Sequence, residues 1–403
     1  MNRWVDAAVR LVAGVEAAVD RVRYGASTRY DDRHARVVPY DGYGTPHAIT
    51  VLGRVLRNPP VAPSRAEATL WENLVDTYRR FETDEVPGAR VRVAAGDAER
   101  ELVADVEGHV LGRLAVERPL PADGGWHAVT YTLLAPVATD APATATGRVL
   151  VPAATAGFGV ISDVDDTVVQ TDVRQMVRMA RTIVFGNART RLPFPGVAAF
   201  YRALEEGYAG SGPNPLFFVS SSPWNLYDLL VEFFELQGIP RGPLLLRDWG
   251  MQAHELLPIG HGSHKQAAIR RILAAYPKLP FILVGDSGQE DPEIYASIVH
   301  DHPGRIRAIY IRDVTRDPTR TSAIRGLAAE VERARCPLIL AEDTVGAARH
   351  AAEHGWIDPS TLSDVGDEKR ADEGATDEKA EAPGVEGPQA PTVVVEDGKA
   401  ESR

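Results

Sequence analysis

The chain has 403 residues, of which 44% are hydrophobic and 25% are charged, and its formal net charge is -12. This length and composition are typical of a two-domain globular protein, and the acidic balance argues against a nucleic-acid partner. The single cysteine, Cys336, excludes an intramolecular disulfide, and no apolar run approaches the roughly 20 residues that span a bilayer. Because charges interrupt the apolar N-terminus, we expect no signal peptide and a cytoplasmic protein without a transmembrane segment, which would meet a membrane only at its surface.

The first 153 residues predict a helical segment followed by a β-rich domain. Residues 1–33 begin with apolar side chains at a helical spacing. We favour packing against the protein's own core over a membrane-surface helix, because the polar face is not rich in basic residues. Residues 34–153 contain short alternating runs between glycines, prolines and aspartates, the pattern of a small sandwich-like antiparallel domain. One stretch inside it, 66–81, has the composition of a helix.

Residues 154–360 predict an α/β domain. Five apolar runs alternate there with helical stretches: FGVISDVDD, LFFVSSS, PLLLRDW, FILVGDS and RIRAIYIRDV. Runs that are apolar throughout indicate a doubly wound parallel sheet, which binds ligands at the carboxyl ends of its strands. The last segment, 361–403, is acidic with almost no aromatic residues, so we expect a disordered tail.

The first polar cluster of this domain is DVDDT, directly after an apolar strand. Since strand side chains alternate, Asp163 and Asp165 point the same way. Two convergent carboxylates repel each other unless a cation lies between them or one is protonated, and Mg²⁺ favours such oxygen ligands. An aspartate can also attack phosphorus as a nucleophile and form an aspartyl-phosphate.

Three further clusters follow in order. Ser220 and Ser221 end the strand LFFV, Lys265 lies near the start of a helix, and Asp286 ends the strand FILV, with Asp291 shortly after. Each alone has a plain explanation, such as a turn. Together they supply hydroxyls and an ammonium for a phosphoryl group, a metal ligand at Asp286, and at Asp291 a group that binds a metal-held water or orients the lysine.

This ordered set resembles the four motifs of the haloacid dehalogenase superfamily. More narrowly, FGVISDVDDTVVQTDV, FVSSSPWNLYDLL, HKQAAI and VGDSGQEDPEIY are similar to the actin-patch-protein type of phosphatidate phosphatase, a relative of lipins. The resemblance covers about residues 155–335 and implies a haloacid dehalogenase-like Rossmannoid fold.

The resemblance also implies a role for each motif residue. Asp163 would be the nucleophile and Asp165 the general acid and base, while Ser220 and Lys265 would hold the phosphoryl oxygens. Mg²⁺ would be bound by Asp163, Asp286 and the main-chain carbonyl of Asp165, and Thr167 would support the loop. Spacing leaves Ser221 as an alternative to Ser220, which we favour because it directly follows the apolar run.

Two features suggest how a substrate would be chosen. The room for a cap domain after the first motif is limited, and an open site suits a lipid head group. Arg174, Arg178 and Arg181 share one helical face, which is either a solvated surface or a contact with anionic lipid. Trp224 would line the entrance or pack in the core, and His254, His261 and His264 lack the companions of a zinc site.

The sequence therefore predicts a Mg²⁺-dependent phosphatase, with phosphatidate at a membrane surface as the favoured substrate and diacylglycerol as the product. Two alternatives stay open. One is a phosphatase for a soluble phosphomonoester or a phosphoprotein. The other is a non-catalytic partner-binding protein, against which the complete motif set argues.

Overall fold

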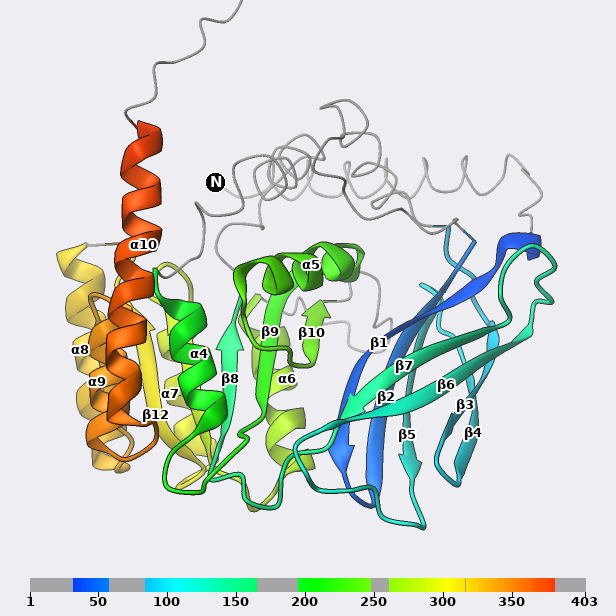
Figure 1. The fold of residues 1–403 in the computed structure, drawn as a ribbon, viewed down its shortest axis with the longest axis horizontal. Coiled ribbons are helices and arrows are strands. Elements are labelled where there is room, and N and C mark those ends of the chain that lie inside the picture. The colour runs from blue at the N-terminus through cyan, green and yellow to red at the C-terminus, as the bar shows by residue number, and fades with distance from the viewer. Residues whose placement is uncertain (1–31, 58–83, 165–194, 248–260, 316, 381–403) are drawn as a thin grey trace, which may run out of the picture.

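The computed structural model describes residues 32–57, 84–164, 195–247, 261–315 and 317–380, which form two β-sheets flanked by helices (Figure 1). The segment up to residue 31, the helix expected at 66–81 and the chain beyond 380 lie outside these residues.

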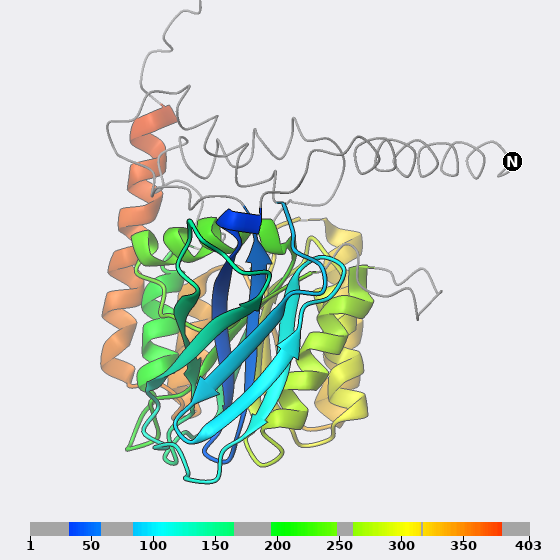
Figure 2. The same cartoon turned by 90° about the vertical axis from the view of Figure 1, so that its right-hand side faces the viewer.

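The first sheet has seven strands in the order β4-β3-β6-β7-β1-β2-β5, and its neighbours are antiparallel except for the parallel pair β1 and β7. Leu102 of β4 packs over Gly112 of β5, where an added Cβ would lie 2.5 Å from a leucine methyl. The sheet therefore curls until its two edge strands meet. The sequence predicted a sandwich-like antiparallel domain, and the structure has one continuous, mostly antiparallel sheet with a single parallel pair (Figure 2). The strands are β1 (Arg36–Thr45), β2 (Ala48–Leu56), β3 (Arg90–Ala95), β4 (Ala98–Val103), β5 (His109–Ala115), β6 (Trp126–Ala135) and β7 (Thr144–Leu150), preceded by the 3₁₀ turn η1 (Asp32–His34).

The second sheet has six parallel strands in the order β10-β9-β8-β11-β12-β13. Every residue of the central strand β8 is buried, which explains why the strand is apolar up to Ile161, before Ser162 and Asp163 at its carboxyl end. The chain runs outward from β8 to β10 and then returns to β11 on the other side. This is the 3-2-1-4-5-6 order of a doubly wound sheet, in which ligands bind where the order reverses. The strands are β8 (Gly159–Asp163), β9 (Leu216–Pro223), β10 (Leu244–Arg247), β11 (Phe281–Asp286), β12 (Ile306–Arg312) and β13 (Leu338–Ala341).

Helices cover both faces of this parallel sheet. One buried cluster joins the sheet to α4, α5, α9 and α10, and a second joins its other face to α6, α7 and α8 (Figure 1). The helices are α4 (Val197–Glu206), α5 (Tyr227–Gln237), α6 (His261–Ala275), α7 (Asp291–Asp301), α8 (Pro318–Arg333), α9 (Thr344–Glu353) and α10 (Leu362–Ala380), with 3₁₀ turns η2 (Trp224–Leu226) and η3 (Pro359–Thr361).

Helix α10 corrects the expectation of a disordered tail from residue 361. Val365 is fully buried, and Glu368 and Asp372 accept hydrogen bonds from the backbone N–H groups of Ala199 and Gly196 at the start of α4. Lys369 pairs with Asp343 at 2.7 Å. These tertiary contacts order a segment whose composition alone predicts disorder.

The two sheets are joined through β1. Tyr40 belongs to one buried cluster of the α/β domain and Tyr43 to the other. Between them, the Asp41 N–H donates to Tyr227 Oη at 2.8 Å, and the Asp41 carboxylate accepts from Arg241 Nε at 2.7 Å. The first sheet therefore packs directly against the part of the α/β domain that follows β9.

Candidate active site

Asp163 lies at the carboxyl end of β8, at the point where the strand order reverses. Its side chain is 3% exposed, and its Oδ1 lies 2.8 Å from Lys265 Nζ. The preceding residue, Ser162, fixes this strand end on the opposite face: its hydroxyl lies 2.6 Å from the Tyr201 hydroxyl and donates to the Asp163 carbonyl. Ser162 therefore fixes the backbone of Asp163, and Lys265 pairs with its carboxylate.

Lys265 is brought to Asp163 by the first turns of α6. Its ammonium donates to Asp291 Oδ1 at 2.8 Å and to Gln289 Oε1 at 3.2 Å, and its side chain is 3% exposed. The lysine therefore bridges the carboxylates of Asp163 and Asp291. The sequence offered two roles for Asp291, binding a metal-held water or orienting the lysine, and the contact with Lys265 fits the second; Gln289 was not anticipated.

Asp286 closes the site at the end of β11. Its Oδ1 accepts hydrogen bonds from the N–H groups of Gly288 and Gln289, which fix the loop. The glycine before it is needed for space, because a Cβ on Gly285 would lie 2.4 Å from Asp291 Oδ2. The GDS sequence therefore allows the Asp291 carboxylate to sit beside the strand.

The charges of this cluster favour a bound cation. Asp163, Asp286 and Asp291 each offer a carboxylate oxygen, and the three oxygens lie within 4.8 Å of one another. Lys265 contacts two of these three buried carboxylates, those of Asp163 and Asp291. Oxygen ligands of this kind suit a hard divalent ion such as Mg²⁺. The same carboxylates, after burial itself, raise the pKa of Tyr295, whose hydroxyl donates to the Val284 carbonyl.

The strand register bears on the two candidate serines. Asp163 pairs with Val219, and Ile161 and Val219 belong to the buried cluster beneath α6 and α7. Beyond Val219 the register of β9 against β10 is irregular, so alternation does not fix which serine lies on the side where Asp163 meets Lys265. Ser220 Oγ accepts a hydrogen bond from the Ser222 N–H. The choice of Ser220 over Ser221 therefore stays a prediction from the sequence.

Trp224 does not line an entrance among the described residues. It is 8% exposed and stacks on Tyr40 of the first sheet, with ring centroids 4.7 Å apart. Its packing role, the alternative considered from sequence, is the one that the structure has. The remaining predicted site residues, Asp165, Thr167, Arg174, Arg178 and Arg181, lie outside the described residues.

Arg320 is a supporting residue that the sequence analysis missed. From α8 it donates to the carbonyls of Ser287 (2.9 Å) and Gln289 (2.5 Å), and it pairs with Glu293. These contacts hold the loop that carries Asp286. No sequence pattern marks this arginine, because it follows the motif at a distance in an arginine-rich chain.

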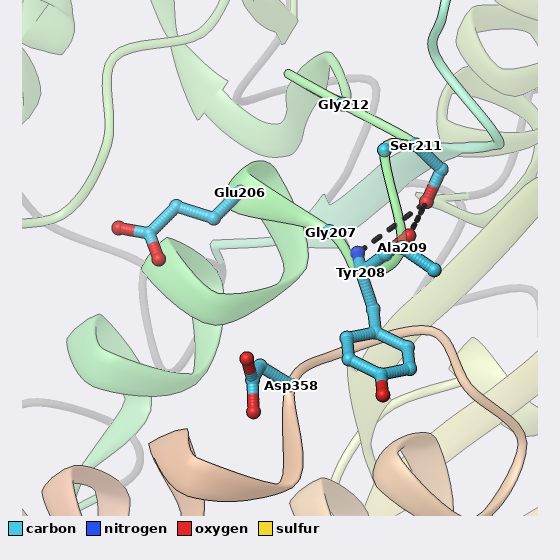
Figure 3. A pocket seen from close by; sticks show the side chains of 8 residues that line it. Glu206, Gly207, Tyr208, Ala209, Ser211, Gly212 and Asp358 are labelled. Atoms are coloured by element: carbon cyan, nitrogen blue, oxygen red, sulfur yellow. Dashed lines mark hydrogen bonds between the residues drawn. The ribbon is translucent and has the colours of Figure 1, made fainter.

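An open hollow of about 300 Å³ lies elsewhere, and we do not assign the chemistry to it (Figure 3). Its walls are residues 206–212 and Asp358. The loop there precedes β9, so the hollow is at the amino edge of the sheet, opposite the carboxylate cluster. Ser211 donates to the Tyr208 carbonyl and shapes the loop, but no lysine lines the hollow.

A doubly wound parallel sheet with a buried lysine between carboxylates at its strand ends is the setting of an α/β enzyme. Residues 158–313 match the family model described as "Phosphatidate phosphatase APP1, catalytic domain". The match covers less than half of the chain and shows that this segment is similar to that catalytic domain.

Two relatives are similar to this chain over about 40% of its length. Phosphatidate phosphatase APP1 of Saccharomyces cerevisiae is 33% identical over 156 residues, which are 39% of this chain and 26% of the yeast protein. An uncharacterized Schizosaccharomyces pombe protein is 30% identical over 164 residues, 40% of this chain and 26% of that one. The chain thus aligns with about a quarter of the length of these relatives.

Among solved structures, a carbohydrate acetylesterase from Xanthomonas citri matches with 13% identity and a TM-score of 0.23, over 67% of this chain and 65% of that one. A likeness this low has no bearing on the function.

Proposed function

We propose that this protein is a Mg²⁺-dependent phosphatase with a haloacid dehalogenase-like catalytic domain, and that it hydrolyses phosphatidate to diacylglycerol and phosphate through an aspartyl-phosphate on Asp163. The observation that carries the proposal is the contact of Lys265 with both Asp163 and Asp291, 2.8 Å each, beside Asp286. The match to the catalytic-domain family and the name of the yeast relative, a phosphatidate phosphatase, support the substrate.

The chemistry divides into two steps. In the first, a carboxylate oxygen of Asp163 attacks phosphorus, the phosphorus–oxygen ester bond breaks, and the leaving alcohol takes a proton from Asp165. In the second, Asp165 removes a proton from water, which attacks the aspartyl-phosphate and releases phosphate and the Asp163 carboxylate. The role of Asp165 rests on the resemblance, since this residue lies outside the described ones.

The chain's own residues prepare both steps. Lys265 orients Asp163. Its ammonium would also balance the negative charge of the phosphoryl oxygens in the transition state, and a strand-end serine hydroxyl would donate a hydrogen bond to one of them. Asp291 and Gln289 fix the lysine. Asp163 and Asp286 would hold Mg²⁺, which when bound supplies positive charge to the phosphoryl group.

The deciding experiment measures phosphate release from phosphatidate vesicles and from p-nitrophenyl phosphate, with Mg²⁺ or with EDTA. We expect Mg²⁺-dependent release that is lost in Asp163→Asn, because the amide is a poor nucleophile. Asp301→Asn, at a partly exposed position paired with Arg270, is the control and should keep full activity. Hydrolysis of the soluble ester alone would overturn the lipid substrate, and no hydrolysis of either would overturn the enzyme assignment.

No helix among the described residues combines the length and apolar character that crossing a bilayer requires.

A further inference from the structure

Arg54 links the first sheet to the α/β domain next to the strand-end serines. It lies on β2, is 4% exposed, and makes contacts on both sides of the interface. Within its own domain it donates to Glu85 Oε1 at 2.8 Å and to the Glu107 carbonyl at 2.9 Å. Across the interface, its Nη1 donates to Asn225 Oδ1 at 2.6 Å. One buried guanidinium thus spans the two domains.

The residue that Arg54 contacts belongs to the turn that follows the serines. Asn225 is the middle residue of η2, and only Pro223 separates η2 from Ser222. The first sheet also contacts residues on both sides of Asn225. Tyr40 stacks on Trp224, and the ring centroids of Tyr40 and Tyr227 are 4.4 Å apart. The path of the chain as it leaves β9 is therefore set by β1 and β2.

The surroundings of Arg54 indicate a fixed geometry. Its ion pair with Glu85 compensates the cost of burying the charge. The nearby His109 imidazole has its pKa lowered to about 3, by burial and then by the Arg54 charge, so it stays neutral and adds no second charge. The planar guanidinium of Arg54 has three hydrogen-bond partners, which hold it in one arrangement. The flexible ammonium of a lysine cannot make the same set of contacts.

We propose that Arg54 is a positioning residue for the phosphatase reaction: through Asn225 it holds the serine segment 220–222 where a hydroxyl meets the phosphoryl group. The first sheet is then a working part of the active site and not a separate module. This inference rests on the proposed function, and its mechanism is geometric, since a small displacement of a phosphate-binding hydroxyl weakens transition-state binding.

The test compares Arg54→Lys, Asn225→Ala and the double variant with a matched control, Arg57→Lys. Arg57 lies one residue beyond β2, donates to the Glu85 carbonyl and pairs with Asp32. Activity on p-nitrophenyl phosphate is measured well below each variant's Tm. We expect kcat to fall roughly 10- to 100-fold in both single variants, with little further loss in the double variant. The control should keep wild-type kcat.

Hydrogen exchange of residues 220–226 provides a readout that does not depend on activity. We expect faster exchange in Arg54→Lys and Asn225→Ala but not in Arg57→Lys. If the wild type hydrolyses no phosphate ester, the proposed function fails, while exchange still decides the positioning role. Unchanged exchange, unchanged kcat, losses that multiply in the double variant, or an equal effect of Arg57→Lys would each overturn the inference.

Discussion

Lys265 is the residue on which most of the site's contacts converge. It reaches Asp163, Asp291 and Gln289 in a space that leaves its side chain 3% exposed. An arginine at this position would keep the positive charge, but its planar guanidinium does not fit the space of the compact lysine ammonium. We expect Lys265→Arg and Lys265→Met to lower kcat by about 100-fold or more, in steady-state assays on p-nitrophenyl phosphate. Lys278→Met, outside the cluster, serves as the control, and near-normal turnover in Lys265→Arg would contradict this role.

The choice between the two strand-end serines can be tested by removing each hydroxyl. Both serines follow Val219, which pairs with Asp163, and the register of β9 is irregular beyond that point. From the sequence we expect Ser220→Ala to lower kcat/KM by roughly 10²- to 10³-fold, the usual effect of removing a donor to the transition state, and Ser221→Ala to cost less. The reverse ranking in the same assay would assign the phosphoryl contact to Ser221.

The convergence of the site residues could be predicted because the carboxyl ends of parallel strands share one edge. Asp163 and Asp286 each end an apolar run, and the structure brings both together with Lys265 and Asp291. Gln289 and Arg320 could not be predicted in this way. Their contribution depends on the direction of a loop and on the packing of α8, neither of which has a sequence pattern.

At the level of elements, α10 shows how a polar helix is stabilised by its neighbours. It buries Val365, and two of its acidic side chains accept from the N–H groups at the start of α4. Ending the chain after residue 361 should lower the free energy of unfolding by roughly 3–5 kcal/mol, from about 1.5–3 for the valine and about 1 for each cap. Urea unfolding measures this loss. Ending the chain after residue 380 is the control, and equal stability of both truncations would refute the role of α10.

Some elements could be predicted from the sequence and others could not. The apolar runs predicted β8, β9, β10, β11 and β12 near their observed positions, because each is buried on both faces. The short edge strand β13 has the apolar sequence LILA but was not among the runs identified from the sequence. The strand order of the first sheet depends on which strands pair. The alternation of apolar and polar residues does not determine that pairing.

For the whole molecule, the contacts of β1 predict that the two sheets unfold together. Asp41 is 5% exposed, and its carboxylate accepts from Arg148 of its own sheet and Arg241 of the α/β domain. Removing the carboxylate leaves two guanidinium groups without their shared partner at a domain interface. Because both arginines keep some solvent contact, we expect Asp41→Ala to cost roughly 2–4 kcal/mol, less than the upper values for fully buried pairs.

Differential scanning calorimetry distinguishes this coupling from two independent domains. The wild type should unfold in one transition, since aromatic stacking and the Asp41 pairs join the first sheet to the cores of the second. Asp41→Ala should lower the Tm or split the transition, whereas Asp140→Ala, at an exposed position 4.0 Å from Arg33, should do neither. Two separate transitions in the wild type would show that the sheets fold alone, and the first sheet could then be removed without loss of the active-site geometry.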